Sequence, residues 1–252
     1  MNLHAVRKAS AYLIGSPTVL VCVGSGLSAE SGVPTFRGPD GMFTDPRIAN
    51  FTQVDTFERE PEAMLTWYQE RRTQLNSVRP NTGHAALARM TNTGNYTIAT
   101  QNVDNLMEAA CKAEGIEAAI HHLHGLLSQV RCHECGKHFD DLSFDLSRCP
   151  RCEACGGRLR PGVVWFGESL PEPTLEMCMQ AARDADVCLM LGTSGLVYPA
   201  AALPEMARSH GAKLIEINTE LTAHSDLCEV IVRGSTATVL PVLERVIRDA
   251  AH

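Results

Sequence analysis

The sequence lacks three features that would point to a membrane, to nucleic acid or to export. No apolar stretch is long enough to span a bilayer. Acidic residues outnumber basic ones, 29 Asp and Glu against 22 Lys and Arg, and the net charge of −7 leaves no basic field for binding phosphates. Residues 1–26 show neither the apolar core nor the cleavage site of a signal peptide. We therefore expect a cytoplasmic protein with no membrane and no specific nucleic acid among its partners, and we expect a monomer.

Disulfides are not expected either, because a chain without an export signal stays in a reducing compartment. Of the ten cysteines, five crowd into one segment. Cys132-x-x-Cys135 followed by Cys152-x-x-Cys155 has the spacing of a four-cysteine zinc ribbon, and Cys149-x-x-Cys152 is a competing second pair. Spacing alone leaves both open. Four thiolates leave no position for water, so we expect a structural zinc whose removal unfolds the module.

The hydrophobic pattern predicts an α/β fold with a Rossmann-like parallel sheet. Continuous apolar, β-branched runs predict strands at Thr18–Gly24, Tyr96–Asn102, Val187–Ser194, Lys213–Asn218 and Val230–Gly234. Helical segments lie between or after them, at Val103–Ala113, Glu172–Asp184, Ala200–His210 and Ala237–Ala251. Such alternation indicates a parallel sheet that helices cover on both faces, with ligands at the carboxyl ends of its strands.

Two segments interrupt this alternation. Gly38–Pro80 has no strand signal and is predicted to be a loop followed by helices, including Pro61–Asn76, while Val130–Pro161 is rich in Cys, Gly and charge. We therefore predict a single domain over residues 1–252 with two lobes. The larger is made of residues 1–37, 81–129 and 162–252, and the smaller of a helical module (38–80) and the zinc ribbon (130–161).

A glycine loop follows the first predicted strand. Gly24-x-Gly26-x-x-Ala29 fits the dinucleotide fingerprint, in which glycines let the backbone approach a pyrophosphate at a helix N-terminus. The motif alone is weak, and a tight structural turn explains it about equally well. The acidic residue that usually closes the next strand is missing, so an ordinary dehydrogenase fits poorly. Phe36 and Arg37 just beyond the loop provide a ring and a cation suited to shielding a reactive sugar–base bond.

Polar residues end the second predicted strand, and a histidine follows later in the chain. If the strands are neighbours, His124 meets Gln101, Asn102 and Asp104 at one sheet edge. A neutral imidazole there can act as a general base, although a single histidine before glycine is more often a loop residue.

In "WYQERR", Tyr68 and Arg71 stand three residues apart, which places them on one face of a helix. Taken in isolation, such a pair indicates a solvated surface.

Taken together, the motifs resemble those of sirtuins, the NAD-dependent protein-lysine deacylases. "GSGLSAESGVPTFRG", "TQNVDNL", "LHG", the CxxC pairs, "LRPGVVWFGESLP", "GTSGLVYPA" and "IEIN" occur in the family's order from about Val19 to Pro241. The resemblance implies a Rossmann-like large lobe, a small lobe with the zinc ribbon, and NAD in the cleft between them. It also implies acyl-lysine proteins or peptides as substrates.

The resemblance implies roles for individual residues. His124, Asn102, Asp104 and Arg37 would be catalytic, and one structural Zn²⁺ would bind Cys132, Cys135, Cys152 and Cys155, with Cys149 as a spare. NAD would contact Gly24, Ser25, Gly26, Ser28, Ala29, Glu30, Pro34, Thr35, Phe36, Arg37, Gln101, Asn102, Asp104, Gly192, Thr193, Ser194, Asn218, Thr219, Glu220 and Thr236. Acyl-lysine would contact Tyr68, Arg71, Val164, Phe166, Gly167, Glu168, Leu196 and Val197.

In the family's reaction nicotinamide leaves and the acyl oxygen attacks the ribose C1′. His124 would then take a proton from a ribose hydroxyl, so that the acyl group passes to ADP-ribose. Sirtuins that prefer succinyl- and malonyl-lysine carry Tyr-x-x-Arg on a small-lobe helix, and Tyr68 and Arg71 match it. A guanidinium can hold a carboxylate with two parallel hydrogen bonds. We therefore predict a desuccinylase and demalonylase, with Arg72 as a bystander and Thr52 as a side chain that narrows the acyl tunnel.

Two alternatives remain open. One is a plain deacetylase or a mono-ADP-ribosyltransferase on the same scaffold, from which the Tyr68/Arg71 pair would distinguish this chain. The other is a non-catalytic zinc-ribbon and nucleotide-binding module, which an intact His124, Asn102 and Asp104 argue against.

Overall fold

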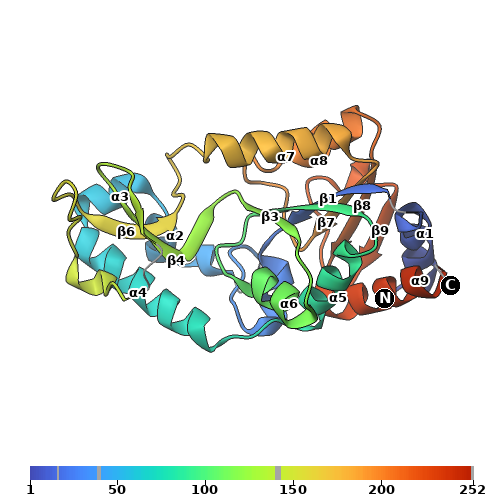
Figure 1. Cartoon of the computed structure of the whole chain (residues 1–252), viewed down its shortest axis with the longest axis horizontal. Coiled ribbons are helices and arrows are strands. Elements are labelled where there is room, and N and C mark those ends of the chain that lie inside the picture. Colours follow the sequence, from blue (N-terminus) through green and yellow to red (C-terminus); the bar gives the residue numbers. More distant parts are fainter. Residues whose placement is uncertain (16, 39–40, 140–142, 251–252) are drawn as a thin grey trace.

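The large lobe is built on a six-stranded parallel sheet (Figure 1). A computed structural model of the chain describes residues 1–15, 17–38, 41–139 and 143–250. The sheet order is β3-β2-β1-β7-β8-β9, and its strands are β1 (Thr18–Val23), β2 (Asn95–Thr100), β3 (Ala119–His122), β7 (Val187–Leu191), β8 (Lys213–Asn218) and β9 (Val230–Arg233). The Rossmann-like parallel sheet predicted from the sequence is thereby confirmed.

Helices cover both faces of this sheet, because alternate residues of each strand point to opposite sides. Val19 and Val21 of β1 pack into one apolar core, and Leu20 and Cys22 into another. The first core lies under the helices α1 (Leu3–Leu13), α5 (Thr82–Thr91), α6 (Leu106–Glu114) and α9 (Thr236–Ala250). The second lies under α7 (Glu172–Asp184) and α8 (Ala202–Ser209), which cross the opposite face (Figure 1).

The small lobe combines a three-stranded antiparallel sheet with short helices. The sheet order is β5-β4-β6, from β4 (Gly125–Cys132), β5 (His138–Phe139) and β6 (Leu159–Val163). The helices are α2 (Pro46–Asn50), α3 (Val54–Arg59) and α4 (Pro61–Ser77). Strand β4 pairs with β6 from Gly125↔Val163 to Cys132↔Leu159, so this sheet extends beyond the predicted 130–161 at both ends. Phe57, Leu65 and Trp165 lie in its core.

The structure differs from the predicted elements at several points, and α5, β4, β5 and β6 were not predicted. Strand β3 was not among the predicted strands, because its sequence, "AIHH", has no continuous apolar run and none of its residues is fully buried. The helix predicted from Val103 begins at Leu106, since the Asp104 carboxylate accepts a hydrogen bond from the Leu106 amide at the turn before it. Instead of an α-helix, the glycine loop enters two 3₁₀ turns, Ser25–Leu27 and Ala29–Ser31.

Parts of three predicted segments lie outside the described residues. They are positions 39–40 of the helical insertion, positions 140–142 of the zinc segment, and Ala251 at the end of the final helix. Within the described ranges, no helix is both long enough and apolar enough to cross a bilayer.

Candidate active site

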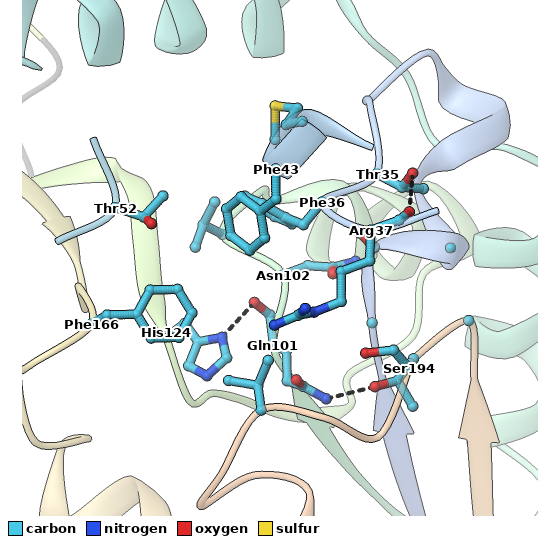
Figure 2. Close-up of a pocket in the computed structure, with 18 of the residues that line it drawn as sticks. Thr35, Phe36, Arg37, Phe43, Thr52, Gln101, Asn102, His124, Phe166 and Ser194 are labelled. Carbon is cyan, nitrogen blue, oxygen red and sulfur yellow. Dashed lines mark hydrogen bonds between the residues drawn. The ribbon is translucent and has the colours of Figure 1, made fainter. Parts of the chain in front are cut away.

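A cavity of about 670 Å³ lies between the two lobes (Figure 2). Residues predicted for NAD line it from the large lobe: Gly24, Ser25, Gly26, Thr35, Phe36, Arg37, Gln101, Asn102, Gly192, Thr193, Ser194, Asn218, Thr219 and Glu220. The predicted base and most predicted substrate residues also line it: His124, Tyr68, Arg71, Val164, Phe166, Gly167, Glu168 and Val197. The structure thus assembles one site from segments that are far apart in the chain.

Some predicted residues lie outside the cavity wall: Ser28, Ala29, Glu30, Pro34, Asp104, Leu196 and Thr236. Ser28, Asp104 and Thr236 are buried behind the wall. The Thr236 hydroxyl donates a hydrogen bond to the Gly26 carbonyl at 3.1 Å, so this side chain supports the glycine loop. Leu196 is 56% exposed.

Gly24 and Gly26 must be glycines because the loop that follows β7 packs directly against them. A Cβ on Gly24 would lie 2.7 Å from the Gly192 carbonyl oxygen, and a Cβ on Gly26 would lie 2.6 Å from the Gly192 Cα. The Gly26 amide donates to the Gly192 carbonyl at 2.9 Å. The tight structural turn is therefore present, and the same closely packed backbones line the cavity.

His124 follows β3 and points into the cavity, near Phe166 and Gln101 (Figure 2). Its Nδ1 donates to the Gln101 carbonyl at 3.0 Å, which leaves Nε2 unprotonated in the neutral ring. Burial lowers the pKa of His124, and the bond to Gln101 only partly opposes this. The ring is therefore neutral at pH 7 and can accept a proton.

A buried network holds Asn102 beside this base. Asn102 Nδ2 donates to the Ser28 hydroxyl at 3.2 Å, and that hydroxyl donates to the Asp104 carboxylate at 2.9 Å. His84, which sequence reasoning missed, lies 3.4 Å from the same hydroxyl, and burial lowers its pKa to about 4. Asp104 and Ser28 thus act behind Asn102, outside the cavity itself.

A second set of hydrogen bonds holds the loop that contains Asn102, and it was also not predicted. His122 donates through Nδ1 to the Asn102 carbonyl at 3.0 Å, and its Nε2 bonds to Glu108 of α6. Burial disfavours a charged ring here, but the bond and charge of Glu108 outweigh burial, so the pKa of His122 is raised. The sequence signal was only a histidine two residues before His124, with no indication of its partner.

Tyr68 and Arg71 of α4 both line the small-lobe end of the cavity. Arg71 is half-buried, donates to Gln74 at 3.2 Å and lies 6.0 Å from the Trp67 ring. Among the described residues no carboxylate lies within ion-pair distance of Arg71. Burial lowers its pKa from 12.5, and an arginine side chain keeps its charge in proteins. The cavity therefore has an unpaired cation at this end.

Two neighbours of this pair make hydrogen bonds within the small lobe. Arg72 does not line the cavity, as expected. It is buried and donates a hydrogen bond to the Phe144 carbonyl at 2.9 Å, which connects α4 to the zinc segment. Thr52 does line the cavity, but its hydroxyl donates to the Ala49 carbonyl at 2.7 Å. Its hydroxyl proton is thus engaged within the chain.

Glu168 supports the cavity wall through its carboxylate. Arg131 donates to both carboxylate oxygens at 2.9 Å, and Arg160 donates to them at 2.6 and 3.0 Å. The Trp165 amide donates to the same group at 2.8 Å. These bonds fix Trp165, a cavity-lining residue that was missed, as were Phe43, Trp67, Leu170, Tyr198 and Leu221.

The sulfur atoms of Cys132, Cys135, Cys152 and Cys155 lie within 4.8 Å of one another. This set decides between the two pairs that spacing left open, since Cys149 is not part of it. Four converging thiol groups on two tight turns are the donor set of a structural zinc, and one Zn²⁺ fits them. The metal would join the β4–β5 turn to the segment before β6.

Comparisons with known proteins agree with this geometry. Residues 24–199 match the model of the Sir2 family. An NAD-dependent protein deacylase from Aquifex aeolicus is 39% identical over 233 residues, covering 92% of this chain and 95% of that protein. A solved Sir2 homologue in complex with NAD has a TM-score of 0.89 at 37% identity, covering 97% and 94% of the two chains. Another, bound to a myristoylated histone peptide, has a TM-score of 0.80 at 28% identity, covering 99% of each.

Proposed function

The chain belongs to the Sir2 family, and we propose that it removes succinyl and malonyl groups, in preference to acetyl, from protein lysines. Its class, an NAD-dependent protein-lysine deacylase, follows from the family and from the relatives that match it over nearly its whole length. The preference rests on one observation, the half-buried guanidinium of Arg71 at the small-lobe end of the cavity with no carboxylate partner in the described chain.

The cavity divides into two regions by the lobe that supplies each wall. Gly24–Gly26, Gln101 and Thr193 form the large-lobe region, where Gln101 Nε2 donates to the Thr193 hydroxyl at 3.0 Å. We assign NAD to this region. The small-lobe region holds Tyr68 and Arg71, and we assign the acyl-lysine to it. The substrate class is an acylated peptide or protein, since a solved relative binds a myristoylated histone peptide.

The residues between these regions supply the proton chemistry. Bound NAD supplies an electrophilic ribose carbon once nicotinamide has departed. His124 accepts a proton from a ribose hydroxyl through Nε2, because Nδ1 is held as a donor to Gln101. Asn102 is kept in place by Ser28, and the ring of Phe36 and the guanidinium of Arg37 shield this region from water.

The carboxylate at the end of a succinyl or malonyl group determines how large the preference over acetyl should be. A carboxylate that reaches Arg71 gains a charged hydrogen bond of roughly 1.5–3 kcal/mol. An acetyl group has no carboxylate and therefore gains no such bond. Because 1.4 kcal/mol corresponds to a factor of ten, the expected preference in kcat/KM is roughly 10- to 150-fold.

The test compares succinyl- and acetyl-lysine forms of one peptide, with nicotinamide release as the readout. Arg71→Met should lower kcat/KM for the succinyl peptide by one to two orders of magnitude and leave the acetyl peptide within about threefold. Arg79→Met, at an exposed arginine outside the cavity, is the matched control and should change neither.

The remaining functions are separable outcomes of the same assay. Equal losses on both peptides would favour a plain deacetylase. Nicotinamide release without an acylated substrate, with ADP-ribose appearing on protein, would favour a mono-ADP-ribosyltransferase. No nicotinamide release with any substrate would favour a non-catalytic binding module.

A further inference from the structure

Trp165 and Tyr68 share a buried hydrogen bond in the cavity wall. The Trp165 indole Nε1 lies 2.8 Å from the Tyr68 phenol oxygen. Both side chains line the cavity, and their exposed fractions are only 2% and 6%. They come from different elements, α4 and the loop after β6, so this contact exists only in the folded small lobe.

The direction of this bond is determined by chemistry. An indole N–H only donates, so the phenol oxygen of Tyr68 must accept. Burial raises the pKa of Tyr68 above its usual value, so the phenol keeps its proton. No acceptor for that proton is found among the described residues. The O–H is therefore free to donate to a ligand, beside a guanidinium that also only donates.

Other contacts hold Trp165 in this orientation before any ligand arrives. Its amide donates to Glu168 at 2.8 Å. The Arg160 guanidinium carbon lies 3.2 Å from the centre of the Trp165 ring. The centre of the Phe57 ring lies 4.9 Å from the centre of the Trp165 ring. The indole is thus a fixed donor, and Tyr68 rather than Trp165 would have to adjust to a ligand.

We propose that Trp165 is a specificity-determining residue: it holds Tyr68 as a hydrogen-bond donor, so that Tyr68 and Arg71 form a donor-only site for the end of the acyl tail. This inference rests on the proposed function, because it assigns the acyl tail to this region. A donor-only site accepts a tail that ends in hydrogen-bond acceptors, such as a carboxylate or a ketone. It rejects a primary amide of the same shape, whose NH₂ group would face Tyr68 or Arg71 without an acceptor.

The experiment uses two neutral tails of equal size on one lysine peptide, 4-oxopentanoyl and succinamyl. They differ only in a terminal methyl or amino group, so charge does not contribute. The wild-type enzyme should turn over the ketone better than the amide. Trp165→Phe keeps an aromatic ring but removes the N–H, which frees Tyr68 to rotate and accept from the amide. The ketone-to-amide ratio of kcat/KM should then fall about threefold to tenfold.

A role in packing alone predicts a different pattern. If Trp165 acts through the phenol, the substitution should leave the ratio unchanged in a Tyr68→Phe background. A ratio that stays at its wild-type value in Trp165→Phe would overturn the inference, as would an equal fall in both backgrounds. Acetyl-peptide turnover and the thermal midpoint of each variant report general damage to the lobe.

Two further measurements distinguish a failure of this inference from a failure of the proposed function. If Trp165→Phe does not fold, the wild-type ratio decides, and a value at or below one overturns the donor-only site. The proposed function fails by a different measurement, namely equal wild-type turnover of succinyl- and acetyl-lysine.

Discussion

Arg160→Met should destabilise the small lobe far more than a typical arginine substitution. The Arg160 side chain is 0% exposed. Its guanidinium makes two charged hydrogen bonds to Glu168 and donates to the Val163 carbonyl at 2.8 Å. Methionine fills a similar volume but provides no donor, so the substitution removes all three bonds and the cation beside the Trp165 ring.

The expected loss is about 3–5 kcal/mol of unfolding free energy, the usual cost of removing one partner from a buried ion pair. The lower half of that range applies here because Arg131 still bonds to both oxygens of Glu168. The unpaired Val163 carbonyl adds roughly 1–3 kcal/mol of desolvation cost, which keeps the total from falling below about 3 kcal/mol.

Urea denaturation followed by tryptophan fluorescence measures this lobe selectively. The chain has only two tryptophans, Trp67 and Trp165, and both contribute to the small-lobe core. Arg148→Met is the matched control: it removes the same side chain from the same lobe, but at a position 84% exposed, and should cost less than about 0.5 kcal/mol. If the two variants lose similar amounts, or if Arg160→Met loses less than about 1 kcal/mol, the buried network does not stabilise the lobe as argued.

Three further predictions follow from other contacts. Because burial lowers the pKa of His124, the acidic limb of kcat/KM should lie below pH 6.5, and a limb at or above 6.5 would contradict a buried neutral base. Because the pKa of His122 is raised in the fold, its interaction with Glu108 stabilises the fold fully below pH 6.5, and this stabilisation is lost as the pH rises through the raised pKa. Glu108→Gln should therefore lower the free energy of unfolding more at pH 6 than at pH 9, as measured by urea denaturation. Cys152→Ala should lower bound zinc, measured by elemental analysis, well below one per chain, whereas Cys149→Ala should retain one.

The fold could be predicted where a pattern is local. Strands β1 and β7 are buried on both faces, so their sequences are nearly continuous apolar runs that can be recognised without knowledge of their neighbours. Strand β3 is an edge strand, and its His122 makes hydrogen bonds with Asn102 and Glu108 that no spacing rule contains. Local sequence thus predicts buried strands and misses an edge strand that is held by side-chain contacts.

The site divides in the same way. Cysteine spacing predicts a zinc module because two tight turns impose it, although only the fold excludes Cys149. The Tyr68/Arg71 pair could be found because one helical turn relates its members. The bond from Trp165 to Tyr68 joins residues 97 positions apart, and the sequence contains no sign of it. Most residues that line the proposed site could be predicted from the sequence, but supporting residues such as His84, His122 and Trp165 could not.

His124 lies where the two lobes meet, and this placement relates specificity to catalysis. Its Nδ1 bonds to the end of the large-lobe sheet at Gln101, while its carbonyl accepts from the Val164 amide just after β6 of the small lobe. A rotation of the small lobe would therefore act on the base through the backbone as well as through the acyl tunnel. Substitutions at Tyr68 or Arg71 leave both of these bonds intact. They should alter the choice of acyl group without changing the pH dependence set by His124, whereas a weakened small lobe should change both.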